Sequence, residues 1–237
     1  MSHVGSLPRC EVETGENLSS HSALLRQKIG LVSPCTSENS PSLLTHPRLR
    51  EFYGELLYVL YSTIRANVPL MQAARDCARS RSFDDRVAAQ IASYLDRHIV
   101  EEMHHDEWLL EDMELLGYKR EAVWKRIPPV ELASLVGAQF YWIQYVHPVA
   151  ILGYIAVLEG DPTPESAVME AISKATLPEA AFRTILIHSR LDPRHRDDFN
   201  AMLDDLPLTQ EHSTLIAISA FHTASAMNSI FAAVQPD

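Results

Sequence analysis

The sequence predicts an all-α protein. From residue 48 onward, apolar residues recur at steps of three or four, which is the period of an amphipathic helix. No segment keeps the two-residue alternation of a strand for long enough to propose a sheet, and no internal repeat is visible. The chain has 237 residues and is 46% hydrophobic, so it is long enough to bury one substantial core.

Composition divides the chain into a tail and one domain. Residues 1–44 are rich in Ser, Pro, Gly, Thr and Asn, which bury little apolar surface, and we expect a mobile N-terminal tail there. The stretch SALLRQKI within this tail could form a short helix. Residues 45–237 are predicted to form a single helical domain.

The first three helices of this domain are long. Apolar periodicity predicts helices over about 48–75, 84–116 and 130–158. Gly117 follows the second helix in a position where helices commonly end. The first and third helices each contain a proline, at which we expect a bend.

Three further helices complete the domain. One follows Pro164, and the next begins at Pro178, whose fixed φ suits the first helical position. The last covers about 208–234, with Thr209 as its expected N-cap.

Charge and composition exclude several classes of partner. A formal net charge of −11 argues against nucleic acid and against an anionic membrane. No apolar run approaches the length needed to span a bilayer, and the N-terminus lacks the features of a signal or transit peptide. The three cysteines show no CxxC spacing, which argues against a disulfide framework and a thiolate zinc site. A cytoplasmic protein that acts on a small molecule fits best.

Four polar side chains occupy the inward stripe of the second predicted helix: His98, Glu102, His105 and Asp112. Burying such groups is costly unless they are paired or bind a metal. Glu102 and His105 have the ExxH spacing, which directs a carboxylate and an imidazole to one point. His98 and Asp112, one and two turns away, could orient metal ligands or be alternative ligands. Ordinary polar contacts in the core would explain these two residues equally well.

The register of this motif has alternatives. Glu101 with His104 is also ExxH, and Glu101 with His105 is an i, i+4 pair. The apolar stripe over 95–109 favours Glu102 with His105 and rotates His104 away.

Two later stretches offer further ligands. HSRLDPRH places His188, Asp192 and His195 at i, i+4 and i+7, which is one helical face. Pro193 within it indicates either a surface turn or a local kink that lets the side chains converge. Glu159 lies at the end of the third predicted helix, on its apolar face. A single glutamate at this position could equally be a helix-end residue that is exposed to solvent.

Together these residues supply three carboxylates and three imidazoles: Glu102, His105, Glu159, His188, Asp192 and His195. Oxygen and nitrogen donors without sulfur suit iron or manganese better than structural zinc. Six protein ligands around two ions leave open positions, which O2 chemistry requires. A ferritin-type bundle is disfavoured because it needs two ExxH motifs, and only EEMHH offers that spacing cleanly.

Three motifs in this order carry a resemblance to a known family: EEMHHDEWLLEDMELLG, HPVAILGYIAVLEG and HSRLDPRHRDDFN. From about Arg48 to the C-terminus the chain resembles the haem-oxygenase-like diiron oxidases and oxygenases. The last motif, H-x3-D-x2-H, is the most specific. The resemblance implies a seven-helix haem-oxygenase-like bundle that holds two Fe ions (Fe2+/Fe3+) and uses O2 as co-substrate. Mapped by motif, the family's ligands fall on the six residues above. His104 departs from the family pattern, in which glycine is common at this position. It could orient a ligand from outside the coordination sphere or be an additional ligand.

The resemblance also implies oxidation of a small carboxylate in biosynthesis. An amino acid or derivative is the favoured substrate, which would undergo N-oxygenation, desaturation, C–C cleavage or nitrile formation. The alternative is oxidative decarboxylation of a fatty acid to a terminal alkene. Tyr141, Trp142 and Tyr145 could wall a substrate pocket, although an aromatic run at helical spacing is more often core.

Other interpretations stay open at this point. A non-catalytic iron-binding bundle, or a protein that oxidises itself at Tyr141 or Tyr145, would use the same ligands. The thiaminase-like branch of the fold needs a catalytic cysteine, which none of the motifs contains. A true haem oxygenase needs an axial histidine, for which His46 is the candidate, and haem would leave three buried carboxylates unexplained. An exposed apolar face on the first or last helix would allow a homodimer.

Overall fold

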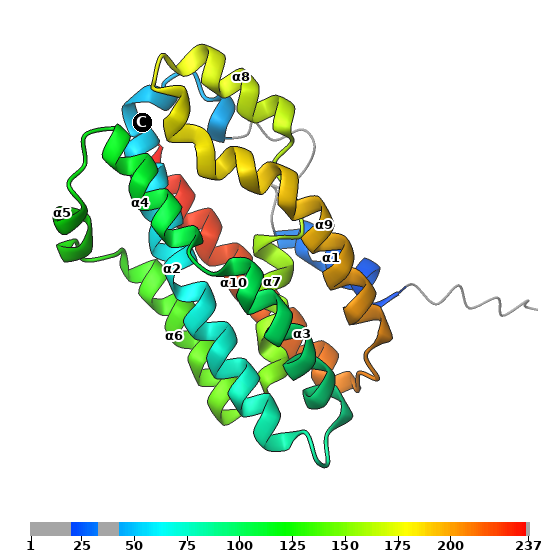
Figure 1. Ribbon diagram of the computed structural model, residues 1–237. Coiled ribbons are helices and arrows are strands. Elements are labelled where there is room, and N and C mark those ends of the chain that lie inside the picture. The colour runs from blue at the N-terminus through cyan, green and yellow to red at the C-terminus, as the bar shows by residue number, and fades with distance from the viewer. Residues whose placement is uncertain (1–19, 33–42, 236–237) are drawn as a thin grey trace, which may run out of the picture.

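The computed structural model describes residues 20–32 and 43–235, and within these residues every regular element is helical (Figure 1). The predicted all-α class is therefore confirmed. In chain order, with η marking a 3-10 helix, the elements are α1 (His21–Val32), η2 (Leu43–Thr45), α2 (Leu49–Arg81), α3 (Arg86–Glu102), α4 (His105–Leu115), α5 (Arg120–Lys125), α6 (Val130–Tyr145), η3 (Pro148–Ala150), α7 (Ile151–Leu158), α8 (Glu165–Ala175), η4 (Glu179–Phe182), α9 (Arg183–Asp205) and α10 (Gln210–Val234).

The expectation of seven helices is wrong. Two of the six helices predicted for the domain are divided, and α1 and α5 are added. The helix expected over 84–116 is α3 and α4, which are separated where His104 adopts a φ of 73°. This interruption is so short that buried residues continue at similar spacing from α3 into α4, so apolar spacing does not reveal it. The helix expected over 130–158 is divided because His147 precedes Pro148 and is extended, with φ −157° and ψ 140°.

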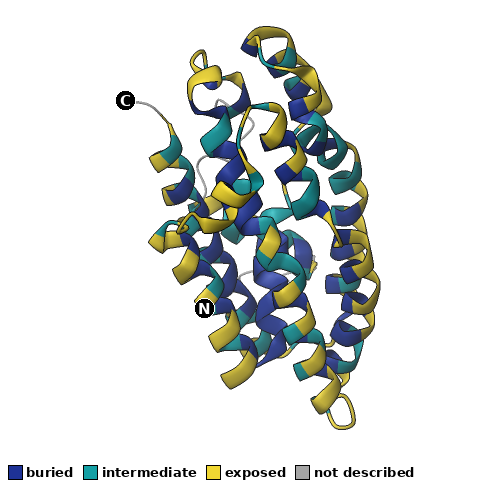
Figure 2. Cartoon of the chain, turned by 60° about the vertical axis from the view of Figure 1, so that its left-hand side comes forward, coloured by how far each residue is buried: buried dark blue, intermediate teal, exposed yellow. Residues whose placement is uncertain are grey.

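The long helices run side by side around one core (Figure 1). α2 has 33 residues, continues through Pro69, and packs against α3, α4 and α6. α10 packs against α7, α1 and α6. Figure 2 shows buried residues on the sides of the helices that face one another and exposed residues on the outer sides. The helices are thus amphipathic, as their spacing predicts.

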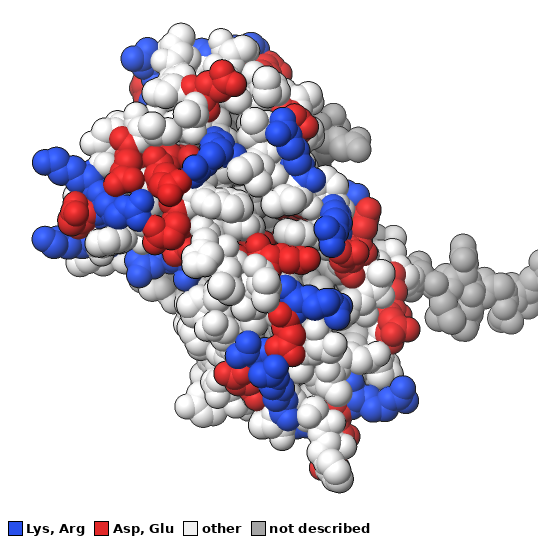
Figure 3. Space-filling model, viewed as in Figure 1, with Lys and Arg blue, Asp and Glu red and all other residues white. Residues whose placement is uncertain are grey.

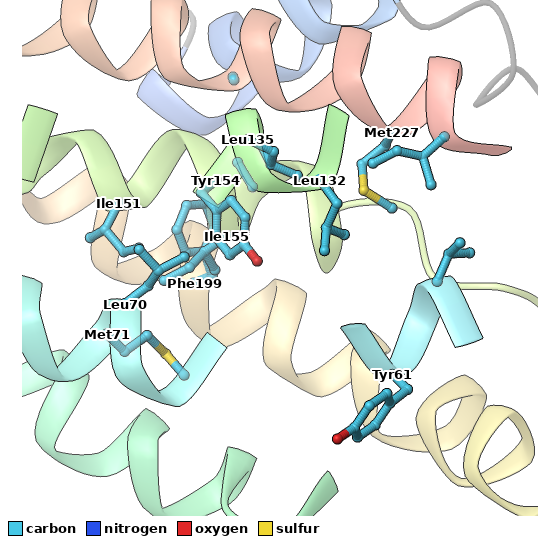
Figure 4. Packing of buried hydrophobic residues seen from close by; sticks show 14 of the residues in the cluster. Tyr61, Leu70, Met71, Leu132, Leu135, Ile151, Tyr154, Ile155, Phe199 and Met227 are labelled. Atoms are coloured by element: carbon cyan, nitrogen blue, oxygen red, sulfur yellow. The ribbon is translucent and has the colours of Figure 1, made fainter. Parts of the chain in front are cut away.

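The apolar core joins helices that are distant in sequence. Figure 4 shows Leu70 and Met71 of α2 beside Ile151 and Ile155 of α7, with Phe199 of α9 next to them. These five side chains are almost fully buried. Their burial holds α7, which ends just before Glu159, against α2.

α7 and α10 approach closely at Gly153. A Cβ atom at this position would lie 2.2 Å from the carbonyl oxygen of Ile216 and 2.7 Å from the backbone nitrogen of Ala220. Only glycine allows two backbones to come this close. This crossing sets how closely α7 packs against α10, and Glu159 directly follows the last residue of α7.

Part of the segment expected as a tail is helical. α1 includes the SALLRQKI stretch, which confirms the short helix predicted there. The N–H and hydroxyl of Ser22 donate to the two carboxylate oxygens of Asp204, at 2.7 and 2.8 Å. Residues 1–19 and 33–42 of the predicted tail lie outside the described residues.

α10 begins where the sequence predicts. The Thr209 hydroxyl accepts a hydrogen bond from the His212 N–H, and the His212 ring accepts one from the Thr209 N–H, which completes a capping box. By length and composition α10 could also cross a membrane, contrary to our expectation that no apolar run is long enough. In the structure 44% of its most apolar window is buried, and it packs as a core helix of the bundle.

Candidate metal centre

Charged side chains mostly lie at the surface, where acidic and basic groups are interspersed on the face shown in Figure 3. An interior group of carboxylates and imidazoles is an exception. It lies between α3, α4, the end of α7, and α9. Four of the six ligands expected from the sequence, Glu102, His105, Glu159 and His188, belong to this group. His195 lies 3.8 Å from Glu102.

Glu102, His105 and His188 form the first part of the centre, with ligand atoms within 4.8 Å of one another. The break at His104 lets the last residue of α3 meet the first residue of α4, and Oε1 of Glu102 lies 3.5 Å from Nδ1 of His105. Nδ1 of His188 lies 2.9 Å from the carbonyl oxygen of Thr184. Because a carbonyl only accepts, Nδ1 carries the proton and Nε2 is free to bind a metal.

His98, Glu102 and Glu159 form the second part, again with ligand atoms within 4.8 Å of one another. Nε2 of His98 lies 2.8 Å from Oε1 of Glu159. The sequence predicts that His98 orients ligands or is an alternative ligand, and the structure places it where it could orient Glu159 or bind metal beside it. Glu102 belongs to both parts, which is where a carboxylate that bridges two ions would lie.

His195 and Asp192 extend the second part from α9. His195 is buried, and its Nδ1 lies 3.8 Å from Oε1 of Glu102. Burial and the negative charges of Glu159 and Glu102 raise the pKa of the Asp192 carboxyl to about 8. α9 continues as a helix through the proline of this motif, so the surface-turn alternative does not apply.

Glu101 and His104 lie at the edge of the centre. The exposed Glu101 carboxylate lies 3.6 Å from Nδ1 of His98 and 4.0 Å from Nε2 of His195. The exposed His104 occupies the left-handed region of backbone conformation. The inward register is therefore that of Glu102. Glycine favours positive φ, so the glycine common here in relatives was the sequence signal for this break.

Burial and mutual charge shift the pKa values of the group. Burial raises the pKa of Glu159, and the hydrogen bond from His98 opposes this. Burial also opposes ionisation of Glu102, but the neighbouring imidazole of His105, with Nδ1 at 3.5 Å, outweighs it and lowers the pKa of Glu102. For His98, burial is outweighed by Glu159, which raises the pKa of the imidazole to about 8. Burial lowers the pKa of His188 and favours the neutral form that binds metals.

Three buried polar atoms at the centre make no hydrogen bond to the described residues. Among the described residues, Oε2 of Glu159, Nδ1 of His105 and Nδ1 of His195 make no hydrogen bond. Buried polar atoms are nearly always paired, so three unpaired atoms in one place indicate a missing ligand. Imidazole nitrogen and carboxylate oxygen are suitable donors for iron or manganese. The residues present therefore fit a metal centre.

The expected aromatic pocket does not lie at this centre. Tyr141 and Tyr145 are 60% and 77% exposed on α6 and pack on each other. Trp142 packs against His222 of α10. The break after α6 interrupts the helical register that would connect these rings to the end of α7.

Two other tyrosines flank the centre instead, and the sequence analysis missed both. The Tyr94 ring stacks on His98 at 5.2 Å between ring centres, and the Tyr154 hydroxyl donates to Oδ1 of Asn67 at 2.7 Å. Burial and the charges of Glu159 and Glu102 raise the pKa of both tyrosines. Tyr94 precedes His98 by one helical turn, so its position on the inward stripe was the available signal.

A second group of metal-binding residue types, Asp85, His147 and His212, lies elsewhere in the bundle. Each accepts a hydrogen bond from the backbone N–H of a helix start, through Oδ1 or Nδ1, at 2.9, 3.1 and 3.3 Å respectively. A neutral imidazole that accepts at Nδ1 carries its proton on Nε2, and His147 donates this proton to Oδ2 of Asp85 at 2.8 Å. The group is thus a hydrogen-bonded cluster of helix caps, and its protonated Nε2 atoms do not suit a metal.

The fold and the centre define an all-helical protein with a buried histidine–carboxylate site that fits a metal. The chain belongs to the iron-containing redox enzyme family, whose model matches residues 79–228. This range includes all six expected ligands. The resemblance inferred from the three motifs is therefore confirmed at the level of the family.

Solved structures agree on the fold. A domain of unknown function with a haem oxygenase-like fold from Shewanella denitrificans OS217 has a TM-score of 0.70 and 19% identity, covering 89% of this chain and 90% of that chain. A TenA homologue from Pseudomonas syringae pv. tomato str. DC3000 has a TM-score of 0.62 and 12% identity, covering 91% and 93%. Curated proteins yielded no match in sequence. At these identities the likeness establishes the haem oxygenase-like fold alone.

Proposed function

We propose that this protein is an O2-activating nonhaem diiron oxidase or oxygenase that oxidises a small carboxylate, with an amino acid or derivative as the favoured substrate class. The observation that carries the proposal is Glu102, which belongs to two adjacent groups of potential ligands. A shared carboxylate is characteristic of centres that hold two metal ions. Membership of the iron-containing redox enzyme family supports both the metal and the redox chemistry.

The two parts of the centre divide the ligands between the ions. Glu102, His105 and His188 would hold one ion. The other would be held by Glu102 with Glu159, Asp192 and His195. Three carboxylates offset most of the charge of two divalent ions, and six protein donors leave coordination positions for O2 and substrate. Bound iron would supply the electrons that reduce O2.

One arginine near the centre could bind a substrate carboxylate. The Arg194 side chain of α9 is 73% exposed, and its ion pairs with described residues are long, 3.7 Å to Glu101 and 3.5 Å to Asp198. Arg183 and Arg190 are engaged in closer ion pairs, at 2.8 and 2.5 Å. An incoming carboxylate could replace Glu101 beside Arg194, at the edge of the centre, with a bidentate hydrogen bond.

The test is anaerobic titration of the apo-protein with Fe(II), followed by O2 in a stopped-flow spectrometer. We expect saturation near two Fe(II) ions per chain and a transient visible absorbance band. Both should be lost or reduced in His188→Ala and Glu159→Ala, and Tyr141→Phe, on the outer face of α6, should behave as the parent chain does. No iron uptake, or uptake indifferent to His188→Ala, would contradict the proposal.

The substrate class is tested in the same instrument. Amino acids and fatty acids are added in separate runs, and we expect an amino acid to accelerate the formation or decay of the band. Acceleration by a fatty acid alone would favour the decarboxylase. If no organic compound is turned over, the protein is an iron store or oxidises itself.

A further inference from the structure

We propose that Asp112 is a positioning residue that sets α4 against α9 and thereby holds His105 and His188 where both can bind one metal ion. The inference rests on the proposed metal centre. Among the described residues no hydrogen bond or ion pair joins Asp112 to either histidine, and its contacts are with the first turn of α9.

Asp112 is a fully buried carboxylate on α4, with 0% exposure. Its Oδ2 accepts a hydrogen bond of 2.9 Å from the backbone N–H of Thr184, and its Oδ1 lies 3.5 Å from Nη2 of Arg183. The first N–H groups of a helix have no partner within the helix, so a carboxylate at this end stabilises it. A buried carboxylate is costly in an apolar core, and these contacts offset part of that cost, although Oδ1 makes no hydrogen bond to the described residues.

One route leads from Asp112 to His188. Thr184, whose N–H binds Asp112, presents its carbonyl oxygen to Nδ1 of His188 at 2.9 Å. Thr184 is therefore held by Asp112 of α4 through its N–H, and it holds the His188 ring through its carbonyl oxygen. This contact keeps the proton on Nδ1 and leaves Nε2 for the metal.

A second route leads to His105. Nη2 of Arg183, beside Asp112, also donates to the carbonyl oxygen of Trp108 at 3.0 Å. The Trp108 ring stacks on the His105 ring, with 4.3 Å between centres and 28° between planes. Arg183 therefore ties the start of α9 to the turn of α4 that carries this stacked pair.

Together these two sets of contacts fix how α9 is rotated and shifted along its axis relative to α4. Asp112 lies two turns after His105 in α4, and Thr184 lies one turn before His188 in α9. With the Asp112–Thr184 contact made, the rings of His105 and His188 meet edge to face at 4.8 Å. Loss of Asp112 would free α9 to slide or rotate, and the two ligands would no longer converge.

The test compares Asp112→Ala with Asp112→Asn, which keeps an oxygen that can accept from Thr184. Tyr53→Phe is the matched control, because the Tyr53 hydroxyl donates to the carbonyl oxygen of Ala181 at 3.0 Å in η4, next to the same junction. The probe is Co(II) binding to the full chain, followed by absorbance. We expect Asp112→Ala to weaken binding of one of the two ions by about tenfold or more.

We expect Asp112→Asn to stay within a few-fold of the parent chain. Tyr53→Phe should lower the thermal unfolding midpoint and leave Co(II) affinity unchanged. Unaltered affinity in Asp112→Ala, or an equal loss in Tyr53→Phe, would overturn the proposal. If Asp112→Ala does not fold, Asp112→Ser, which leaves a smaller cavity and does not reach Thr184, replaces it with the same expected loss.

A second readout uses the metal-free protein. Long-range 1H–15N NMR spectra report which ring nitrogen of His188 carries the proton, and we expect Nδ1–H in the parent chain and in Asp112→Asn. Asp112→Ala should show a mixture of tautomers. If the parent chain binds no metal but this change occurs, the proposed function fails and the positioning role stands. If metal binds and the tautomer and affinity do not respond to Asp112, the positioning role fails alone.

Discussion

Nε2 of His98 lies 2.8 Å from Oε1 of Glu159, and this contact joins α3 to the end of α7 across the candidate metal centre. The side chains are only 3% and 13% exposed, so water cannot readily replace either partner. One oxygen of Glu159 is thereby occupied, and the other is the buried atom without a partner. The pair thus presents one free carboxylate oxygen to a metal.

We expect His98→Leu to lower the free energy of unfolding of the metal-free protein by about 3 kcal/mol, because it leaves the Glu159 carboxylate buried without a donor. Urea denaturation at neutral pH measures the change. The double variant His98→Leu with Glu159→Gln should recover part of the loss, since a neutral amide costs less to bury than a carboxylate. A single variant as stable as the parent would show that the contact does not hold the charge.

Glu102 should matter to both metal ions, whereas Glu159 should matter to one. We expect Glu102→Gln to reduce iron binding to near zero and Glu159→Gln to leave about one ion per chain, because only Glu102 belongs to both parts of the centre. Iron is measured after anaerobic loading and gel filtration. Equal iron content in the two variants would argue against a bridging role.

The left-handed conformation of His104, with a φ of 73°, is unfavourable for any residue other than glycine. We expect His104→Gly to raise the free energy of unfolding by about 1 kcal/mol, after allowance for the greater freedom of glycine in the unfolded chain. His104→Ala is the control and should give no such gain. Because the side chain is exposed, iron content should not change; a loss of iron in both variants would instead identify His104 as a ligand.

The sequence was sufficient to predict what depends on spacing within a helix. His188, Asp192 and His195 all lie in α9, so their spacing was enough to place them along one helix. Glu102 and His105 were also expected to share a helical face, but they end α3 and begin α4, and the turn at His104 brings them together. Contacts between helices were not predictable in this way. The pairing of His98 with Glu159 joins residues 61 positions apart, and the placement of Tyr94 beside His98 became meaningful only once α7 and α9 were packed against α3.

Errors arose where the backbone leaves the helical period. The turn at His104 and the extended residue before Pro148 are each short enough to leave the apolar pattern intact. Counting residues along one continuous helix therefore could not relate Tyr141 to the end of α7, because the chain leaves the helical conformation between them. The steric effect of proline on the preceding residue was available as a signal, and it would have placed the second break.

Acid should weaken the helix caps around Asp85. Burial opposes ionisation of Asp85, but the hydrogen bonds from the Ala88 N–H and from His147 outweigh it and hold its pKa below the usual value. Because the folded state then binds this proton less tightly than the unfolded state, the contribution is complete above the unfolded pKa of about 3.9 and is lost as the pH falls through the folded value. We expect Asp85→Ala to cost about 1 kcal/mol at neutral pH and progressively less below pH 4.

The control for this prediction is Asp85→Asn, which keeps a capping oxygen and loses the charge. It should retain most of the stability at neutral pH and lack the acid-dependent loss. Chemical denaturation across the pH range gives the comparison. A cost of Asp85→Ala that is the same at low and neutral pH would show that the charge contributes nothing.

Two glycines in helices should respond oppositely to alanine. At Gly153 a Cβ atom would lie 2.2 Å from the backbone of α10, and at Gly137 it would meet nothing within 4 Å. We expect Gly153→Ala to destabilise the fold by roughly 3 kcal/mol through overpacking, and Gly137→Ala to stabilise it by up to about 1 kcal/mol through helix propensity. Thermal denaturation of both variants measures these changes. Because α7 ends at Glu159, Gly153→Ala should also weaken iron binding, and Gly137→Ala should leave it unchanged; normal iron binding in a destabilised Gly153→Ala variant would show that the depth of α7 does not position this ligand.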